Sequence, residues 1–405
     1  MANNNYSVII DLKKLEEEGL ICDEKALIHQ KQIDEVCKII KKRMAYIEYH
    51  PERKMHSMND VVSIFARRGA GKTTFVKSLK KLISENQNGS FHGVDCSQLI
   101  VIDVIEPNQI QKKENFMVRF LAFIHSVFKA EISRRDEKTR KRFEEATNEL
   151  YEAMPVMDGI GKLSMYSDWT DSDYVAENFM NLAMKAKDLE KRFHQYINVA
   201  LDIFGKKSLL FILDDCDVNI EKTFEILETI RLFFTSPQII VLMTGDATLY
   251  GMTVRQNYWK FFDKDFLNKE CDFAVSSENK KTAYSKMVSR LETQYLQKMI
   301  KPEHRILLDN VYEKYRYNRI ASSEEQKYSI GIKFSNVQDG EPKELRQIYE
   351  TIFRTLGMIN SNQTDRDVFV NHLLRQPFRN QYRLLSIYND FLAEHPYNMN
   401  SETSF

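Results

Sequence analysis

The chain has 405 residues, of which 58 are Lys or Arg and 58 are Asp or Glu, so its formal net charge is zero. This balance gives no general support for nucleic-acid binding, which usually shows as an excess of basic residues. The five cysteines are scattered, odd in number and without C-x-x-C spacing, which argues against a disulfide framework and against a zinc site.

The sequence gives no sign of secretion or of a membrane segment. It begins without the charged and then apolar arrangement of a signal peptide. Its most apolar helical stretch, residues 116–130, contains Arg119 and His125 and is shorter than the roughly twenty residues that span a bilayer. We therefore expect a soluble, cytoplasmic protein that does not enter a membrane.

Residues 1–57 are expected to form an N-terminal segment that leads to the core. Residues 7–10 are apolar enough for a short strand, and apolar residues recur at helical spacing over residues 24–49. The sequence therefore predicts a strand and a long helix ahead of the core.

The most informative stretch follows, the run Ala66-Arg67-Arg68-Gly69-Ala70-Gly71-Lys72-Thr73-Thr74. It lies between a strand-like run, residues 61–65, and a helix-like run, residues 74–83, which is the context that a phosphate-binding P-loop requires. The small residues let backbone N–H groups surround phosphates, and the start of the helix adds its positive dipole end. Ala66 stands where the usual motif has its first glycine, and alanine is tolerated there if its φ is negative.

The P-loop predicts a nucleotide site with Mg²⁺. Lys72 is expected to reach the β- and γ-phosphates, and the Thr73 hydroxyl is expected to bind Mg²⁺. The nucleotide-binding residues are then Arg68, Gly69, Ala70, Gly71, Lys72, Thr73 and Thr74.

Residues 99–105 form the next apolar run, and Glu106 at its end is a candidate for the edge of the site. A turn begun by Pro107 is the simpler interpretation of that position. Residues 113–206 then have a helical pattern, with a Gly-containing interruption around residues 155–167, which predicts a long helical insert.

A second chemical signal ends the strand-like run of residues 208–213, where the chain reads Asp214-Asp215-Cys216-Asp217. Carboxylates at the carboxyl end of a buried parallel strand lie at the edge where open α/β sheets bind ligands. Asp214 is expected to hold Mg²⁺, and Asp215 to orient or polarise the attacking water. Cys216 is expected to be a buried thiol without a role in the chemistry.

Further along, residues 221–234 predict a helix and residues 238–243 a strand. Thr244, at the tip of that strand, is expected to contact the γ-phosphate or the water. A helical region is then expected to run to about residue 308. Another helix is expected to start at Pro342, and helices to continue to residue 394.

These elements predict an α/β fold: a P-loop NTPase core with a parallel sheet flanked by helices, a large helical insert and a C-terminal helical lid. The expected domains are an N-terminal segment (1–57), the first part of the core (58–112), the insert (113–206), the second part of the core (207–270), the lid region (271–360) and a C-terminal helical segment (361–405).

Taken together, these blocks resemble the KAP-type and STAND-like branch of P-loop NTPases, relatives of AAA+ proteins. The resemblance covers about residues 58–356 and rests mainly on the P-loop and on residues 210–250, with weaker similarity at residues 295–300 and 341–346. Val218 stands where the family usually has an arginine, and the chain lacks the transmembrane helices that membrane-associated members carry in the insert. The soluble insert is also similar to the ATPase of RADAR-type anti-phage systems.

The resemblance implies several further roles. Arg346, or Lys343, would act as a second sensor on the lid helix. Arg255, with Arg231 in reserve, would reach a neighbouring subunit's nucleotide. The leading segment would contact adenine through His29 or Gln30.

We therefore expect an ATPase that uses Mg²⁺, forms a homo-oligomer such as a ring, and acts on an effector protein in anti-phage defence. The absence of an obvious N-K-x-D element favours ATP over GTP. Two alternatives remain open at this point: a nucleotide-gated module that recruits an effector with little turnover, and a nucleic-acid-linked ATPase using basic patches such as Arg67-Arg68.

Overall fold

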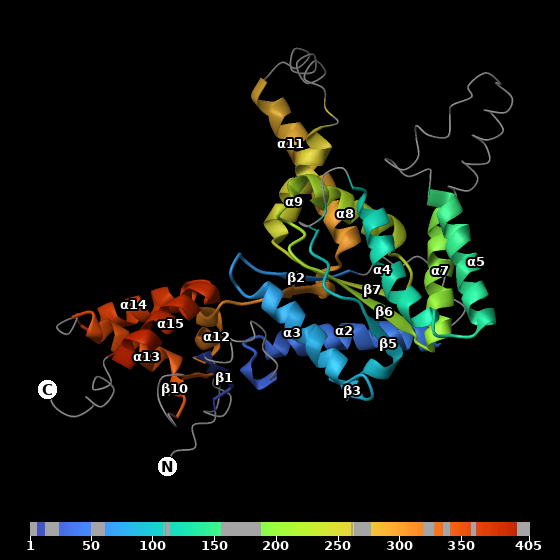
Figure 1. Cartoon of the computed structure of the whole chain (residues 1–405). Coiled ribbons are helices and arrows are strands. Elements are labelled where there is room, and N and C mark those ends of the chain that lie inside the picture. The colour runs from blue at the N-terminus through green and yellow to red at the C-terminus, as the bar shows by residue number, and fades with distance from the viewer. Residues whose placement is uncertain are drawn as a thin grey trace. The chain divides into compact units, whose positions relative to one another are not determined.

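The computed structural model describes residues 6–12, 24–49, 61–107, 110, 114–154, 188–260, 262, 277–318, 328–334, 341–357 and 362–394. The chain divides into two compact units. The first unit comprises Met1–Glu35, Phe65–Glu85 and Leu307–Phe405, and the second comprises Val36–Ile64 and Asn86–Ile306. Figure 1 labels many of the elements of each.

A five-strand parallel sheet flanked by helices is the centre of the second unit, with the strand order β5-β6-β7-β2-β8. Every residue of β2, β6 and β7 is buried, as expected of strands covered on both faces. The sheet confirms the predicted α/β fold. Its strands are β2 (Val61–Phe65), β5 (Leu99–Val101), β6 (Ser208–Leu213), β7 (Ile239–Gly245) and β8 (Arg305–Leu307).

The position of β7 decides which residues meet at the carboxyl edge of the sheet. β6 pairs in parallel with β5 and with β7, so that Leu213 is opposite Met243. β7 in turn lies between β6 and β2. The residue after β6, Asp214, is therefore a neighbour of Thr244 near the end of β7.

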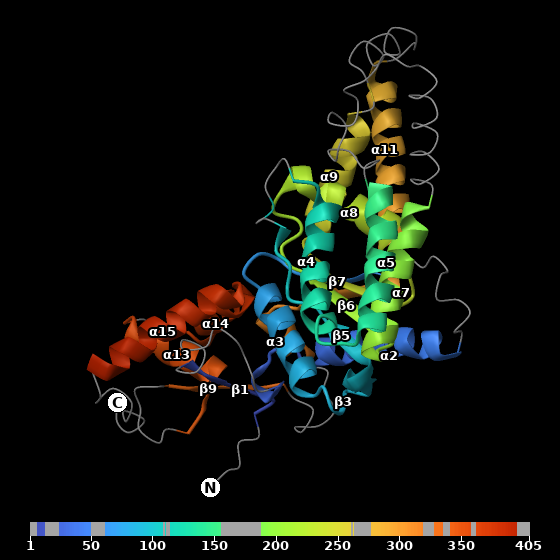
Figure 2. The same cartoon turned by 45° about the vertical axis from the view of Figure 1, so that its right-hand side comes forward.

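Helices account for the predicted insert and for most of the remaining second unit. Figure 2 shows α4, α5 and α7 side by side. Helix α5 contacts α4 and α7, and both α4 and α7 contact α8. The ring of Phe120 on α4 lies 4.6 Å from that of Phe211 on β6 and 4.3 Å from that of Phe234, which joins the helices to the sheet. The helices are α4 (Phe116–Ile132), α5 (Glu137–Ala153), α7 (Leu189–Phe204), α8 (Ile220–Phe233), α9 (Ala247–Trp259) and α11 (Ser277–Met299).

Short elements complete the second unit. A hairpin of β3 (Ser90–Phe91) and β4 (Val94–Asp95) precedes the turn η3 (Cys96–Gln98), and the turn η6 (Pro302–His304) precedes β8. Helix α2 (Gln30–Tyr49) begins in the first unit and ends in the second.

The first unit combines a small sheet with helices from distant parts of the sequence. β1 (Val8–Asp11) pairs in parallel with β9 (Ile330–Lys333), and β10 (Lys343–Glu344) pairs with β9 in the antiparallel sense. Apolar residues of this sheet form one core with those of α12 to α15. The helical elements are η1 (Glu24–Ala26), α3 (Lys72–Glu85), α12 (Val311–Tyr317), α13 (Leu345–Thr355), α14 (Gln363–Arg375) and α15 (Phe378–Glu394).

Three expected boundaries differ from the structure. The first long helix starts at Gln30, because a separate turn, η1, precedes it. The lid helix starts at Leu345 and not at Pro342, since Lys343 and Glu344 pair as β10 and the Glu344 carboxylate caps the helix at Gln347 N. The region expected to stay helical to about residue 308 contains β8. The Gly-containing interruption expected around residues 155–167 lies outside the described residues.

Within the described part of the chain, no helix combines the length and the apolar character needed to cross a bilayer.

Candidate functional site

The P-loop belongs to the first unit and has the backbone that its glycines allow. Gly69 and Gly71 have φ values of 83° and 92°, in the left-handed region that only glycine adopts at little cost. Among the described residues, His92 and Asp215 are the only non-glycine residues with positive φ, so Ala66 has the ordinary conformation that makes its alanine acceptable. The sequence-based interpretation of Ala66 therefore agrees with the geometry.

Lys72 is the first residue of α3 and is only 8% exposed. Its ammonium group donates a hydrogen bond to the carbonyl oxygen of Ala66 at 2.9 Å, across the mouth of the loop. A phosphate group would take the place of this carbonyl as the stronger, charge-assisted acceptor. Thr73 and Thr74 follow on the first turn of α3, where the helix dipole favours an anion.

The start of α15 lies directly against the P-loop. The backbone N–H of Arg379 donates to the carbonyl oxygen of Gly69 at 3.2 Å. A Cβ atom on Gly69 would lie 3.0 Å from the Cβ of Pro377, tighter than ordinary contact. The sequence pattern did not predict this contact, although Pro377 followed by a helical pattern is a helix-start signal that points to Arg379.

A cavity of about 180 Å³ opens between the P-loop, the start of α2 and the start of α15. Its wall is mostly apolar, which suits a flat aromatic base. His29 lines it, whereas the Gln30 amide is bonded to the carbonyl oxygens of Ser7 and Glu24. The lining residues are Leu27, Ile28, His29, Gly69, Ala70, Gly71, Thr74, Phe75, Phe378, Arg379 and Tyr382.

The imidazole of His29 is neutral in this cavity. Burial, and secondarily the positive charge of Lys314, lower the pKa of His29 from 6.5 to about 3. The ring lies edge-on to that of Phe75, with 6.3 Å between their centroids. His29 therefore adds a polar but uncharged group to the apolar wall.

In the second unit, the acidic residues are held by Thr244. The Thr244 hydroxyl donates a short hydrogen bond to Asp214 Oδ1 and accepts one from the backbone N–H of Asp215 at 3.0 Å. Asp214 and Thr244 are both buried. Two residues singled out separately in the sequence, at the ends of β6 and β7, thus form one polar group.

Asp215 has an unusual backbone, with φ of 52°. Left-handed backbone at a non-glycine residue costs on the order of 1–3 kcal/mol and persists only where neighbouring groups hold it. Here the Thr244 hydroxyl holds the Asp215 N–H, and Asp217 accepts the N–H of Asp246 at 2.8 Å. Both strand ends are therefore fixed around the Asp215 turn.

Cys216 is buried, and burial raises the pKa of its thiol well above the ordinary value. The burial agrees with the prediction of a buried thiol at this position, and a neutral thiol is a poor nucleophile. Glu106 is partly buried beyond β5, and Pro107 begins a turn as expected.

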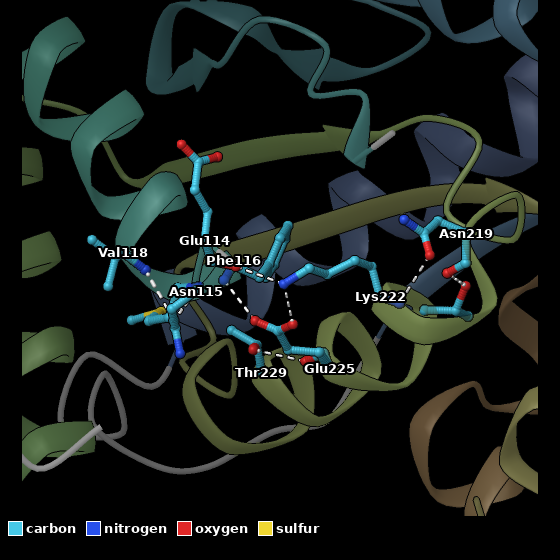
Figure 3. A network of polar contacts seen from close by, with 10 residues as sticks. Glu114, Asn115, Phe116, Val118, Asn219, Lys222, Glu225 and Thr229 are labelled. Carbon is cyan, nitrogen blue, oxygen red and sulfur yellow. Dashed lines mark hydrogen bonds and ion pairs between the residues drawn. The ribbon is translucent and has the colours of Figure 1, made fainter. Parts of the chain in front are cut away.

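The helix that follows the acidic loop is fixed by a polar network (Figure 3). The buried Lys222 ammonium donates to the carbonyl oxygen of Glu114 at 2.6 Å and to Glu225 Oε2 at 2.7 Å, and Glu225 Oε1 accepts the backbone N–H of Phe116 at 2.7 Å. Asn115 caps α4 and Asn219 caps α8. The network thereby joins the starts of α4 and α8.

Each arginine predicted to sense the nucleotide is bonded within its own unit. Arg255 on α9 donates to the hydroxyls of Ser285 and Ser289 and lies 3.6 Å from Glu292. Arg346 on α13 donates to Asp367 at 2.9 Å and lies 3.7 Å from Glu350. Arg231, the reserve candidate, pairs with Glu228 on the same helix. Their roles toward a nucleotide stay predictions.

The available metal ligands suit Mg²⁺ bound together with a nucleotide better than they suit a metal bound only by protein side chains. No group of three or more His, Cys, Asp or Glu side chains that could hold a metal occurs among the residues described. Magnesium usually takes only one or two carboxylates, with the remaining positions filled by phosphate oxygens and water. The two ligands predicted from the sequence, Asp214 and Thr73, each carry an oxygen donor of the type that Mg²⁺ prefers.

A glycine turn that leads from a buried parallel strand to a lysine and threonine at a helix start, with an acidic strand in the same sheet as that strand, defines a P-loop NTPase. The family model described as the KAP family P-loop domain matches residues 31–359, and the chain therefore belongs to the KAP family. Membership indicates nucleotide binding and hydrolysis. A search of the curated proteins found no match.

Proposed function

We propose that the protein is a Mg²⁺-dependent ATPase whose hydrolysis drives oligomer assembly or conformational switching. The observation that carries the proposal is the P-loop itself: two left-handed glycines, a buried Lys72 at the start of α3, and an adjoining cavity with an apolar wall. A triphosphate suits the loop and a purine suits the wall.

Each residue has a stated task in this proposal. Lys72 exchanges the Ala66 carbonyl for phosphate oxygens. Thr73 and Asp214 are the protein ligands of Mg²⁺, which when bound neutralises phosphate charge. Asp215 orients the attacking water, and Thr244 holds both carboxyl-bearing residues in place.

Phosphate release from ATP and from GTP tests the proposal, with oligomeric mass recorded on the same samples. Wild type should release phosphate from ATP faster than from GTP. Lys72→Ala should lose turnover, while Lys77→Ala, on the same helix but outside the loop, should keep it. Turnover that survives in Lys72→Ala would reject the P-loop as the site.

A nucleotide-gated module that recruits an effector is the second candidate. The observation in its favour is that Arg255 and Arg346 are held in ion pairs. Either side chain would have to leave its pair before it could contact a nucleotide and assist hydrolysis. Asp215→Asn separates the two candidates. If this variant loses turnover but still binds the partner, the nucleotide-gated module is favoured. If it loses both turnover and partner binding, the ATPase whose hydrolysis drives assembly or switching is favoured.

The role in anti-phage defence comes from the resemblance to RADAR-type ATPases. Its test is phage infection of cells that express the wild type or Lys72→Ala. Protection by the wild type alone would support the role, and equal plaque counts would contradict it. A nucleic-acid-linked ATPase would instead show stimulation by DNA or RNA that falls steeply with salt.

A further inference from the structure

The buried side chain of Tyr250, on α9, joins the two chain segments that carry the acidic group. Its hydroxyl donates to the carbonyl oxygen of Thr244 at 2.7 Å. The same hydroxyl is hydrogen-bonded to the thiol of Cys216, the residue after Asp215. Tyr250 is completely buried, so neither bond competes with water.

The aromatic ring of Tyr250 is fitted against Gly245. A Cβ atom on Gly245 would lie 2.5 Å from the Tyr250 hydroxyl oxygen and 2.6 Å from ring carbons. The ring therefore occupies the space that a side chain would need at position 245. Since Gly245 follows Thr244, this close approach fixes the peptide group whose carbonyl oxygen Tyr250 binds.

The bonds continue from Thr244 to the turn at Asp215. The Thr244 hydroxyl accepts the Asp215 N–H and donates to Asp214. Asp215 needs such support because its φ of 52° is unfavourable for a residue with a side chain. Tyr250 thus acts on this turn from two sides, through Thr244 and through Cys216.

We propose that Tyr250 is a positioning residue for nucleotide hydrolysis, which holds the Asp215 turn so that its carboxylate is correctly placed for the water. The proposal rests on the proposed function, because it assigns a role in the same reaction. Tyr250 acts through other residues and has no part in binding phosphate. Its loss should therefore lower kcat and leave nucleotide affinity unchanged.

Tyr250→Phe is the most direct test, since it keeps the ring and removes the hydroxyl. We expect kcat for ATP to fall about tenfold, which is about 1.4 kcal/mol and near the upper end for one hydrogen bond. The Kd for ATP, measured by calorimetry, should stay within about twofold. Cys216→Ala, which removes the other contact, should lower kcat by a smaller factor.

Tyr349→Phe is the matched control. It removes an equally buried hydroxyl, which donates to Gln381 Oε1 at 2.9 Å in the first unit. A merely structural role for Tyr250 would make both variants lose stability and change kcat alike. The proposal requires that the two variants lose a similar amount of melting temperature, and that kcat falls in Tyr250→Phe but not in Tyr349→Phe.

Substitutions of Thr244 provide an independent check, which does not depend on whether the Tyr250→Phe variant folds correctly. Thr244→Ser retains the hydroxyl and should keep most of the turnover, whereas Thr244→Val removes the hydroxyl that binds Asp214 and the Asp215 N–H and should lose turnover. If kcat is unchanged in Tyr250→Phe, or if it falls by the same factor as the ATP affinity, this inference is wrong and the proposed function still stands. A wild type that binds ATP without any turnover overturns the proposed hydrolysis and this inference together.

Discussion

Gly69 and Gly71 have the same kind of backbone conformation, but a side chain should cost more stability at Gly69 than at Gly71. Both have left-handed φ values, but a Cβ would meet Pro377 at position 69 and nothing within 4 Å at position 71. Gly71→Ala should cost about 1–2 kcal/mol of stability from backbone strain alone. Gly69→Ala should cost more, because Pro377 and the start of α15 must also move.

Chemical unfolding of the two alanine variants, side by side, measures this difference. Equal losses of unfolding free energy in the two variants would show that Pro377 and the start of α15 can move away from the P-loop at no cost. The same variants should also bind ATP more weakly than the wild type, since the loop's N–H groups are then misdirected.

His29 gives the first unit a defined sensitivity to acid. Its pKa is about 3 when folded and 6.5 when exposed, so between these values the unfolded chain binds a proton that the folded chain does not. Stability from this residue is present above pH 6.5 and is lost as the pH falls toward 3. Relative to His29→Leu, the wild type should lose stability over that range. A pH-independent difference in unfolding free energy would contradict this.

At the scale of elements, the network around Lys222 decides how firmly α4 and α8 are joined. Lys222 is 8% exposed, and Lys222→Met would leave the Glu225 carboxylate without its cation. We expect a loss of about 2 kcal/mol, within the range for a charged hydrogen-bonded group left unsatisfied. Urea unfolding measures it.

The pair Lys141–Glu137 is the matched control, because it has the same chemistry on an exposed helix face, with both side chains at least 67% exposed. Lys141→Met should change stability by less than about 0.5 kcal/mol. Restoring stability in the double variant Lys222→Met/Glu225→Gln would confirm that the unpaired carboxylate is the cause. Equal effects at the two sites would refute it.

The elements that the sequence predicted well are those whose pattern is local. β2, β6 and β7 are continuous apolar runs, and the glycine turn carries its own signature. β8 has only one buried residue between two exposed ones, so its pattern could not distinguish it from a loop. β10 became visible only when Lys343 and Glu344 were seen paired with β9.

The candidate site follows the same rule. Lys72, Asp214 and Thr244 stood out because each ends or begins a patterned element. Arg379, Phe378 and Tyr382 line the cavity but come from a helix near the end of the chain, and only the tertiary fold brings them to the P-loop. Tyr250 had no sequence signal, since a tyrosine on a helix is most often an ordinary core residue.

At the scale of the whole molecule, the predicted role of Arg255 makes activity depend on concentration. An arginine that completes a neighbour's site raises turnover about a thousandfold or more in related reactions. ATPase activity per subunit should therefore fall on dilution through dissociation, and Arg255→Ala should remove that dependence. Activity that is flat across dissociation, followed by mass photometry, would contradict a role in trans.

The first unit is assembled from the beginning, the middle and the end of the chain: β1 pairs with β9, and Gly69 bonds to Arg379. During synthesis, the P-loop leaves the ribosome long before its partners in α15 exist. A nascent or prematurely terminated chain would carry the phosphate-binding signature without the wall of its cavity. We therefore expect the cavity beside the P-loop to be complete only once the segment that contains α15 has been made and has folded against Gly69.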